Sequence, residues 1–193
     1  MPFYIAAEEN ANLLLDQSPL ALLIGMVLDQ QIPMERAFSA PYLLQDRLGQ
    51  PLDAQYIATM DPEKLQELFS IKPALHRFPS AMAKRVAEVA RLVAVDYNND
   101  AGAIWNNATS PSDLFKRICD LPGFGIDKTK IFIALLGKQV GIKIDGWQEV
   151  CQPFGEEGTT ISVADIIDDA TFASVRQFKQ EMKLAKKAKT DEV

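Results

Sequence analysis

Apolar residues along this chain recur mostly at intervals of three and four, which is the spacing of one face of an α-helix. Segment 19–34 (PLALLIGMVLDQQIPM) is apolar on nearly all sides up to Asp29, and Ser18 followed by Pro19 is a favourable helix start. This segment predicts a buried central helix. The helix is expected to end near Pro33, because proline lacks a backbone donor and disfavours helix in the residue before it.

The same spacing predicts further helices through most of the chain. They are expected over 61–69 with an Asp61 cap, over 80–97, over 110–119 with a Ser110 cap, over 128–136, and as one or two helices within 163–182. The only candidate for a strand, 140–144, is short. The fold class is therefore predicted to be all-α. The end of the chain, KLAKKAKTDEV, is expected to be a frayed basic tail.

Length and composition fit one globular domain over residues 1–193. Hydrophobic residues make up 48% and charged residues 24%, which is ordinary for a chain that folds alone. No internal repeat or linker stands out. The stretch 154–162 is the best candidate for a loop between two lobes.

Charge and cysteine content narrow the classes of partner and cofactor. The net charge is −6, so any DNA contact must come from a local basic patch. Cys119 and Cys151 alone cannot supply a four-thiolate zinc or iron–sulfur site, and so few cysteines indicate a reducing compartment. The N-terminus lacks a signal-peptide pattern, and no run reaches the roughly 18 apolar residues of a membrane span. We expect a cytoplasmic protein without a membrane partner.

The most specific segment is LPGFG, residues 121–125, between two predicted helices. Gly123 and Gly125 allow a tight reversal and leave backbone N–H groups accessible at the start of the second helix, where the helix dipole favours an anion. Lys128, Thr129 and Lys130 follow in the first turn, which suggests an external negative charge such as a DNA phosphate. The alternative is a simple helix connector with solvated lysines.

Four segments together resemble the HhH-GPD superfamily of base-excision DNA glycosylases. They are LLIGMVLDQQ (22–31), HRFPSAMAKRV (76–86), LPGFGIDKTKIFIALLGK (121–138) and IDGWQEV (144–150). The resemblance covers about residues 20–150. It implies a two-lobed helical fold with a helix–hairpin–helix over 114–136, followed by C-terminal helices and the basic tail over 151–193.

The resemblance also implies roles for particular residues. The hairpin Pro122, Gly123, Phe124 and Gly125 would hold a DNA phosphate through backbone amides, and its carbonyls could hold a monovalent cation. Gln31 would enter the duplex beside the damaged base. The cluster cysteines of many members are missing, so no iron–sulfur cluster is expected.

Two further positions would carry the chemistry. Asp145 stands where the family places its catalytic aspartate. The Schiff-base lysine of bifunctional members would fall on Asp127, and Lys128 comes one residue late, a rotation of about 100° on a helix. A monofunctional glycosylase without strand cleavage is favoured.

Some of these residues have plainer interpretations. Asp145 could instead cap the helix of Gly146–Glu149, and Trp147 could be a structural anchor rather than a stacking platform for an extruded base. His76, the only histidine, excludes a Ser-His-Asp triad with a spare base and reads best as a surface or capping residue.

The sequence thus favours a DNA glycosylase acting on double-stranded DNA as a monomer. Ten basic residues flank the hairpin in the sequence and could share a face: Lys72, Arg77, Lys84, Arg85, Lys116, Arg117, Lys128, Lys130, Lys138 and Lys143. The alternatives are a non-catalytic helix–hairpin–helix DNA-binding protein and a helical protein-interaction domain in which LPGFG is only a turn.

Overall fold

The structure, a computed structural model, describes the backbone of residues 3–191 and the side chains of residues 3–185. Within that range the regular elements are all helical and none is a strand, which confirms the all-α class. The helices are α1 (Glu9–Gln17), α2 (Pro19–Leu28), α3 (Met34–Leu48), α4 (Ala54–Thr59), α5 (Pro62–Ser70), α6 (Pro79–Asp96), α7 (Ala103–Asn106), α8 (Pro111–Cys119), α9 (Ile126–Leu135), the π-helical turn η1 (Leu136–Val140), α10 (Trp147–Val150), the 3-10 turn η2 (Val163–Asp165) and α11 (Asp169–Asp191).

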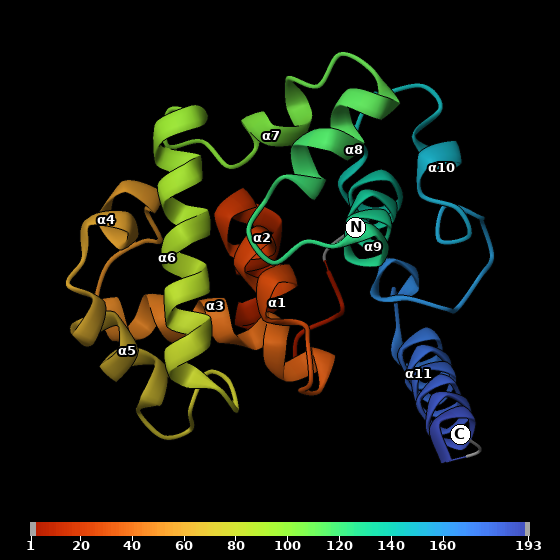
Figure 1. Cartoon of the computed structure of the whole chain (residues 1–193), viewed down its shortest axis with the longest axis horizontal. Coiled ribbons are helices and arrows are strands. Elements are labelled where there is room, and N and C mark those ends of the chain that lie inside the picture. The colour runs from red at the N-terminus through yellow and green to blue at the C-terminus, as the bar shows by residue number, and fades with distance from the viewer. Residues whose placement is uncertain (1–2, 192–193) are drawn as a thin grey trace.

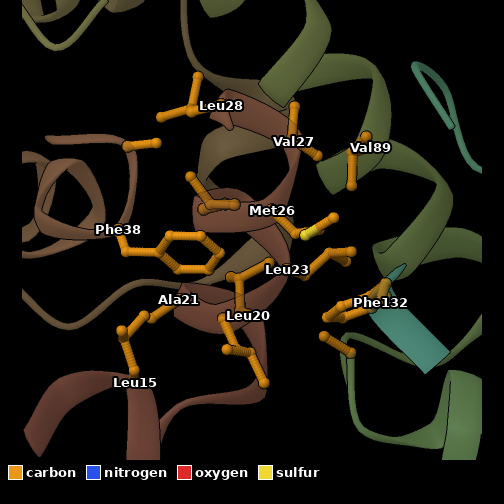
Figure 2. Close-up of a cluster of buried hydrophobic side chains, with 14 of the residues drawn as sticks. Leu15, Leu20, Ala21, Leu23, Met26, Val27, Leu28, Phe38, Val89 and Phe132 are labelled. Atoms are coloured by element: carbon orange, nitrogen blue, oxygen red, sulfur yellow. The ribbon is translucent and has the colours of Figure 1, made fainter. Parts of the chain in front are cut away.

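Helix α2 is the centre of the core, as its apolar sequence predicts. Every residue from Leu20 to Leu28 is buried. The Ser18 hydroxyl accepts a hydrogen bond from the Ala21 amide at 3.1 Å and so caps the helix. A side chain at Gly25 would come within 2.7 Å of the Phe38 ring, so the glycine lets α3 pack closely against α2. Figure 2 shows the Phe38 ring beside α2.

The remaining helices surround α2 on two sides (Figure 1). Helices α4 and α5 pack on α6, and α7 and α9 pack on α8. Val89 of α6 and Phe132 of α9 both face α2 (Figure 2), so the two sides share one core. Helix α11 extends away from the other helices toward the C-terminus.

Two local predictions differ from the structure. Helix α2 ends at Leu28 rather than near Pro33, and Gln31 in the connection has a φ of 56°. The short strand candidate 140–144 forms no strand, in line with the all-α prediction: Val140 ends η1 and residues 141–144 are irregular. The backbone of α11 continues to Asp191, so the expected frayed tail is helical over 183–191, a stretch rich in helix-forming Lys and Ala, while residues 192–193 lie outside the described part.

Within the described residues, no single helix has both the length and the apolar character of a membrane span. Only α1 and α2 taken together pass that test, and they are bent by 117° at their junction.

Candidate functional site

The hairpin joins α8 to α9 by a tight turn. Gly123 has a φ of 88°, and the Phe124 amide donates to the Leu121 carbonyl at 3.0 Å. The Phe124 ring is buried, with its centroid 5.7 Å from that of Phe132. The turn is therefore anchored by an aromatic side chain that points inward, while its backbone stays at the surface.

Five backbone N–H groups at this turn have no hydrogen-bond acceptor within the described part of the chain. They belong to Gly123, Gly125, Ile126, Asp127 and Lys128. Free donors at a helix N-terminus suit an anion. The exposed Asp127 carboxylate lies in the same turn and would compete with a phosphate.

The two glycines of the turn differ in role. A Cβ at Gly123 would lie 2.8 Å from the Arg85 guanidinium in a backbone conformation that favours glycine. Gly125 has a φ of −96°, and a Cβ there would meet nothing within 4 Å. The prediction that both glycines serve the reversal is wrong for Gly125, whose missing side chain only keeps the amides uncovered.

Lys128 connects the hairpin to the end of α2. Its Nζ donates to the carbonyls of Met26 at 3.0 Å and Val27 at 3.1 Å. These are among the last carbonyls of α2, which no intrahelical amide can satisfy. Burial lowers the pKa of the Lys128 amine to about 8, although Asp29 acts in the opposite direction. Lys128 is therefore not a free surface cation for phosphate.

Asp29 is a functional candidate that the sequence interpretation missed. It follows the last residue of α2, its side chain is 12% exposed, and its carboxylate accepts from Lys179 of α11 at 3.3 Å. The signal in the sequence was its place as the first charged residue after a long apolar run. Asp29 pairs with Lys179 of α11, and the Lys128 amine binds two α2 carbonyls, those of Met26 and Val27, just before Asp29.

His76 fixes the loop that carries Gln31. Its Nε2 lies 2.9 Å from the Gln30 carbonyl, and its Nδ1 accepts from the Phe78 amide at 3.1 Å. The neutral tautomer with the proton on Nε2 satisfies both contacts. The expectation of a surface histidine is wrong, since His76 is 1% exposed and its burial lowers its pKa. Gln31 itself is exposed.

Two of the predicted DNA contacts point elsewhere. Thr129 is fully buried, and its amide donates to the Gly125 carbonyl at 2.9 Å, so neither group can reach a phosphate. Lys130 donates to the Gln152 carbonyl at 3.0 Å. Helix periodicity explains Thr129, because it lies on the face of α9 that packs on the core. Pro122 is half-buried. Binding of a monovalent cation by the hairpin carbonyls stays a prediction.

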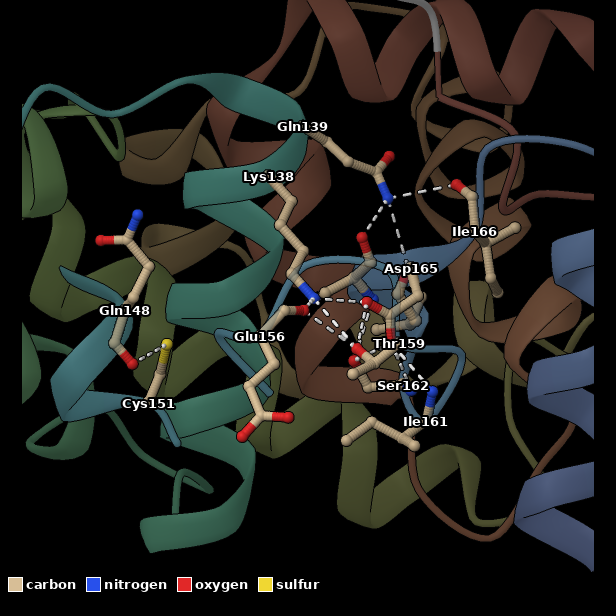
Figure 3. Close-up of polar contacts among 12 residues, drawn as sticks. Lys138, Gln139, Gln148, Cys151, Glu156, Thr159, Ile161, Ser162, Asp165 and Ile166 are labelled. Atoms are coloured by element: carbon tan, nitrogen blue, oxygen red, sulfur yellow. Dashed lines mark hydrogen bonds and ion pairs between the residues drawn. The ribbon is translucent and has the colours of Figure 1, made fainter. Parts of the chain in front are cut away.

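Several other basic residues near the hairpin in sequence form internal ion pairs. Lys138 pairs with the buried Asp165 carboxylate, as Figure 3 shows, and α8 holds the pairs Lys116–Asp120 and Arg117–Asp113. Fewer of the ten basic residues are therefore available for the shared basic face that the sequence allowed.

Asp145 and Trp147 lie at the other end of the α8–α9 pair. A Cβ at Gly146 would be 3.5 Å from Pro111, the first residue of α8, whereas the hairpin follows the last, about 13 Å along the helix axis. Figure 1 shows α10 on the opposite side of α8 and α9 from the turn that joins them. The structure does not bring Asp145 together with the hairpin.

The structure contradicts the helix-cap interpretation of Asp145 and supports the structural-anchor interpretation of Trp147. Asp145 is exposed, and α10 begins after Gly146 without a side-chain cap. Trp147 is half-buried against Gly137, where any Cβ would overlap the indole. Trp147 is thus a structural anchor rather than a base platform.

Comparison of the chain with protein-family models, with curated proteins and with solved structures gave no match.

Proposed function

We propose that this chain is a base-excision protein of the helix–hairpin–helix type, a DNA glycosylase with a two-lobed HhH-GPD-like fold. One observation carries the proposal: Lys128 reaches from the hairpin to the end of α2, where its amine binds the carbonyls of Met26 and Val27, shortly before Asp29 and the loop that carries Gln31. The free amides would hold a phosphate, and the amine and carboxylate would lie where an extruded nucleotide arrives.

The chemistry proposed at this site uses Lys128 as nucleophile. At a pKa of about 8, about a tenth of the amine is neutral near pH 7, far more than for an ordinary lysine. The Lys128 nitrogen would attack the sugar C1′ while the bond from C1′ to the base breaks, and the base would leave with the bonding electrons and take up a proton. Loss of a proton from nitrogen and opening of the sugar ring then give an imine.

Asp29 would assist this reaction through its charge. A carboxylate beside the sugar favours the positive charge that develops as the base departs, and a low-dielectric position strengthens the effect. Asp29 takes this role in place of Asp145, which lies at the far end of α8. This route uses an amine nucleophile in place of the monofunctional hydrolysis expected from the sequence.

The test is borohydride trapping on duplexes that carry single lesions or an abasic site. We expect wild type to form a covalent adduct, Lys128→Met to form none, and Asp29→Asn to react roughly a hundredfold more slowly. Asp145→Asn is the matched control and should behave as wild type. Normal reaction by Lys128→Met, or loss of reaction in the Asp145→Asn control, would overturn the assignment.

A second candidate is a non-catalytic DNA-binding protein. It is favoured by the two carbonyl contacts of Lys128, which also suit a purely structural cap of α2. Duplex binding by wild type without base release or adduct on the whole lesion panel would support this function instead.

A further inference from the structure

A groove with a volume of about 630 Å³ separates the loop after α2 from helix α11. Its walls include Gln31 and Arg77 on one side and Arg176, Lys179 and Lys183 on the other. The three α11 cations follow a spacing of three and four residues, so they lie on one helix face. This groove is outside the segments that resemble the glycosylase family, apart from Gln31 and Arg77.

The groove keeps an excess of positive charge. Lys179 pairs with Asp29 at 3.3 Å, and Arg176 lies 4.0 Å from Glu35. Arg77 and Lys183 are exposed, and neither has a carboxylate partner within the described side chains. Four cations thus face two carboxylates.

The groove is continuous with the proposed reaction site. Lys179 on its wall pairs with Asp29, Lys128 from the hairpin binds the carbonyls of Met26 and Val27 just before Asp29, and the exposed Gln31 forms part of the rim. A duplex held at the hairpin with Gln31 directed into it would pass over this groove. An acidic protein partner would account for the groove alone, whereas a duplex accounts for the groove and the hairpin together.

We propose that the groove binds backbone phosphates of duplex DNA, on the far side of Gln31 from the hairpin. The inference rests on the proposed function, since it needs a duplex docked at the hairpin. Exposed Arg and Lys side chains are suited to phosphate oxygens and fix position without reading sequence. Helix α11 would thereby be a second contact with the DNA backbone, independent of the hairpin amides.

The experiment measures duplex affinity of the full chain as a function of salt. The double variant Arg176→Gln/Lys183→Gln removes two groove cations. Lys64→Gln/Arg91→Gln is the matched control, because it removes one exposed Lys and one exposed Arg from α5 and α6, which lie across the molecule from α11 in Figure 1. The probe is a short duplex with one abasic site.

The groove variant should bind more weakly at low salt, and the slope of log affinity against log salt should become less steep by about two, roughly one for each phosphate that the variant no longer neutralises. The control should keep the wild-type slope. Equal slopes for groove variant and wild type, in proteins with equal melting temperatures, overturn the groove proposal.

Two other results separate the two proposals. Absence of duplex binding by wild type overturns the proposed function and the groove with it. Reduced affinity in the groove variant with the adduct-forming step unchanged at saturating protein supports the groove as a binding surface only.

Discussion

At the residue scale, the hairpin shows how identical residue types can have different roles. Gly123 takes a left-handed backbone conformation beneath Arg85, whereas Gly125 is extended and faces open space. The first is needed for the fold. The second is needed only if something must approach the backbone closely, which is why Gly125 bears on function.

Substitution of the two glycines should therefore change different properties, stability for Gly123 and duplex binding for Gly125. Gly123→Ala should lower the free energy of unfolding by about 1 kcal/mol or more, because alanine is strained at positive φ and meets Arg85. Gly125→Val should leave stability nearly unchanged and weaken duplex binding for all sequences. Thermal unfolding and duplex titration of the two variants check this. Wild-type duplex affinity in folded Gly125→Val would remove the hairpin amides from the interface.

At the element scale, the end of α2 is determined by other parts of the chain. The carbonyls of Met26 and Val27 accept from a lysine about a hundred residues later, and the His76 ring binds the Gln30 carbonyl in the loop that follows. These carbonyls would otherwise need backbone amides from a longer helix as donors. Because side chains supply the donors instead, the helix stops at Leu28, although Pro33 is the first sequence signal for a stop.

Burial of the Lys128 amine makes the free energy of unfolding depend on pH. Because the folded pKa of Lys128, about 8, lies below its ordinary value of 10.5, the unfolded chain binds an additional proton between those two values. Wild type should gain about 1 kcal/mol of stability per pH unit relative to Lys128→Met between pH 8 and 10.

Urea unfolding of both proteins across this range tests the prediction. The nearby charges of Asp29, Arg85 and Lys179 are the same in the two proteins, so they affect both curves. A stability difference that does not change with pH would mean that Lys128 is protonated throughout.

At the scale of the whole molecule, a buried ion pair joins two turns that are distant in sequence. Lys138 of η1 meets Asp165 of η2, whose carboxylate is 2% exposed and also accepts from the Ile161 and Ser162 amides. This pair fixes the loop over 156–165 to the end of α9 (Figure 3). It thereby sets where α11 begins.

Removal of the cation should be strongly destabilising. Lys138→Met leaves the Asp165 charge buried without its partner and should lower stability by about 3 kcal/mol or more. Lys116→Met is the control, since the Lys116–Asp120 pair is exposed and should matter little. Melting temperatures decide between them, and equal small shifts would contradict a structural role for the Lys138 pair.

Local sequence signals determined where three of the helices begin. Ser18, Asp61 and Ser110 each cap the helix predicted from them, and the continuous apolar run of α2 could only be a buried element. The position of the hairpin between α8 and α9 also followed from LPGFG. These features depend on residues a few positions apart, so the sequence alone was sufficient.

Only the tertiary structure decided which side chains meet. It turned Thr129 into the core and placed Asp145 at the end of α8 that lies away from the hairpin. It also brought Lys128 of α9 and Lys179 of α11 to the C-terminal end of α2, where Asp29 lies. No local pattern specifies these contacts, because they depend on which distant segments the tertiary fold brings together and on the partners that a buried group such as the Asp29 carboxylate then finds. The candidate site is therefore a product of packing, while the helices that carry it are a product of the sequence.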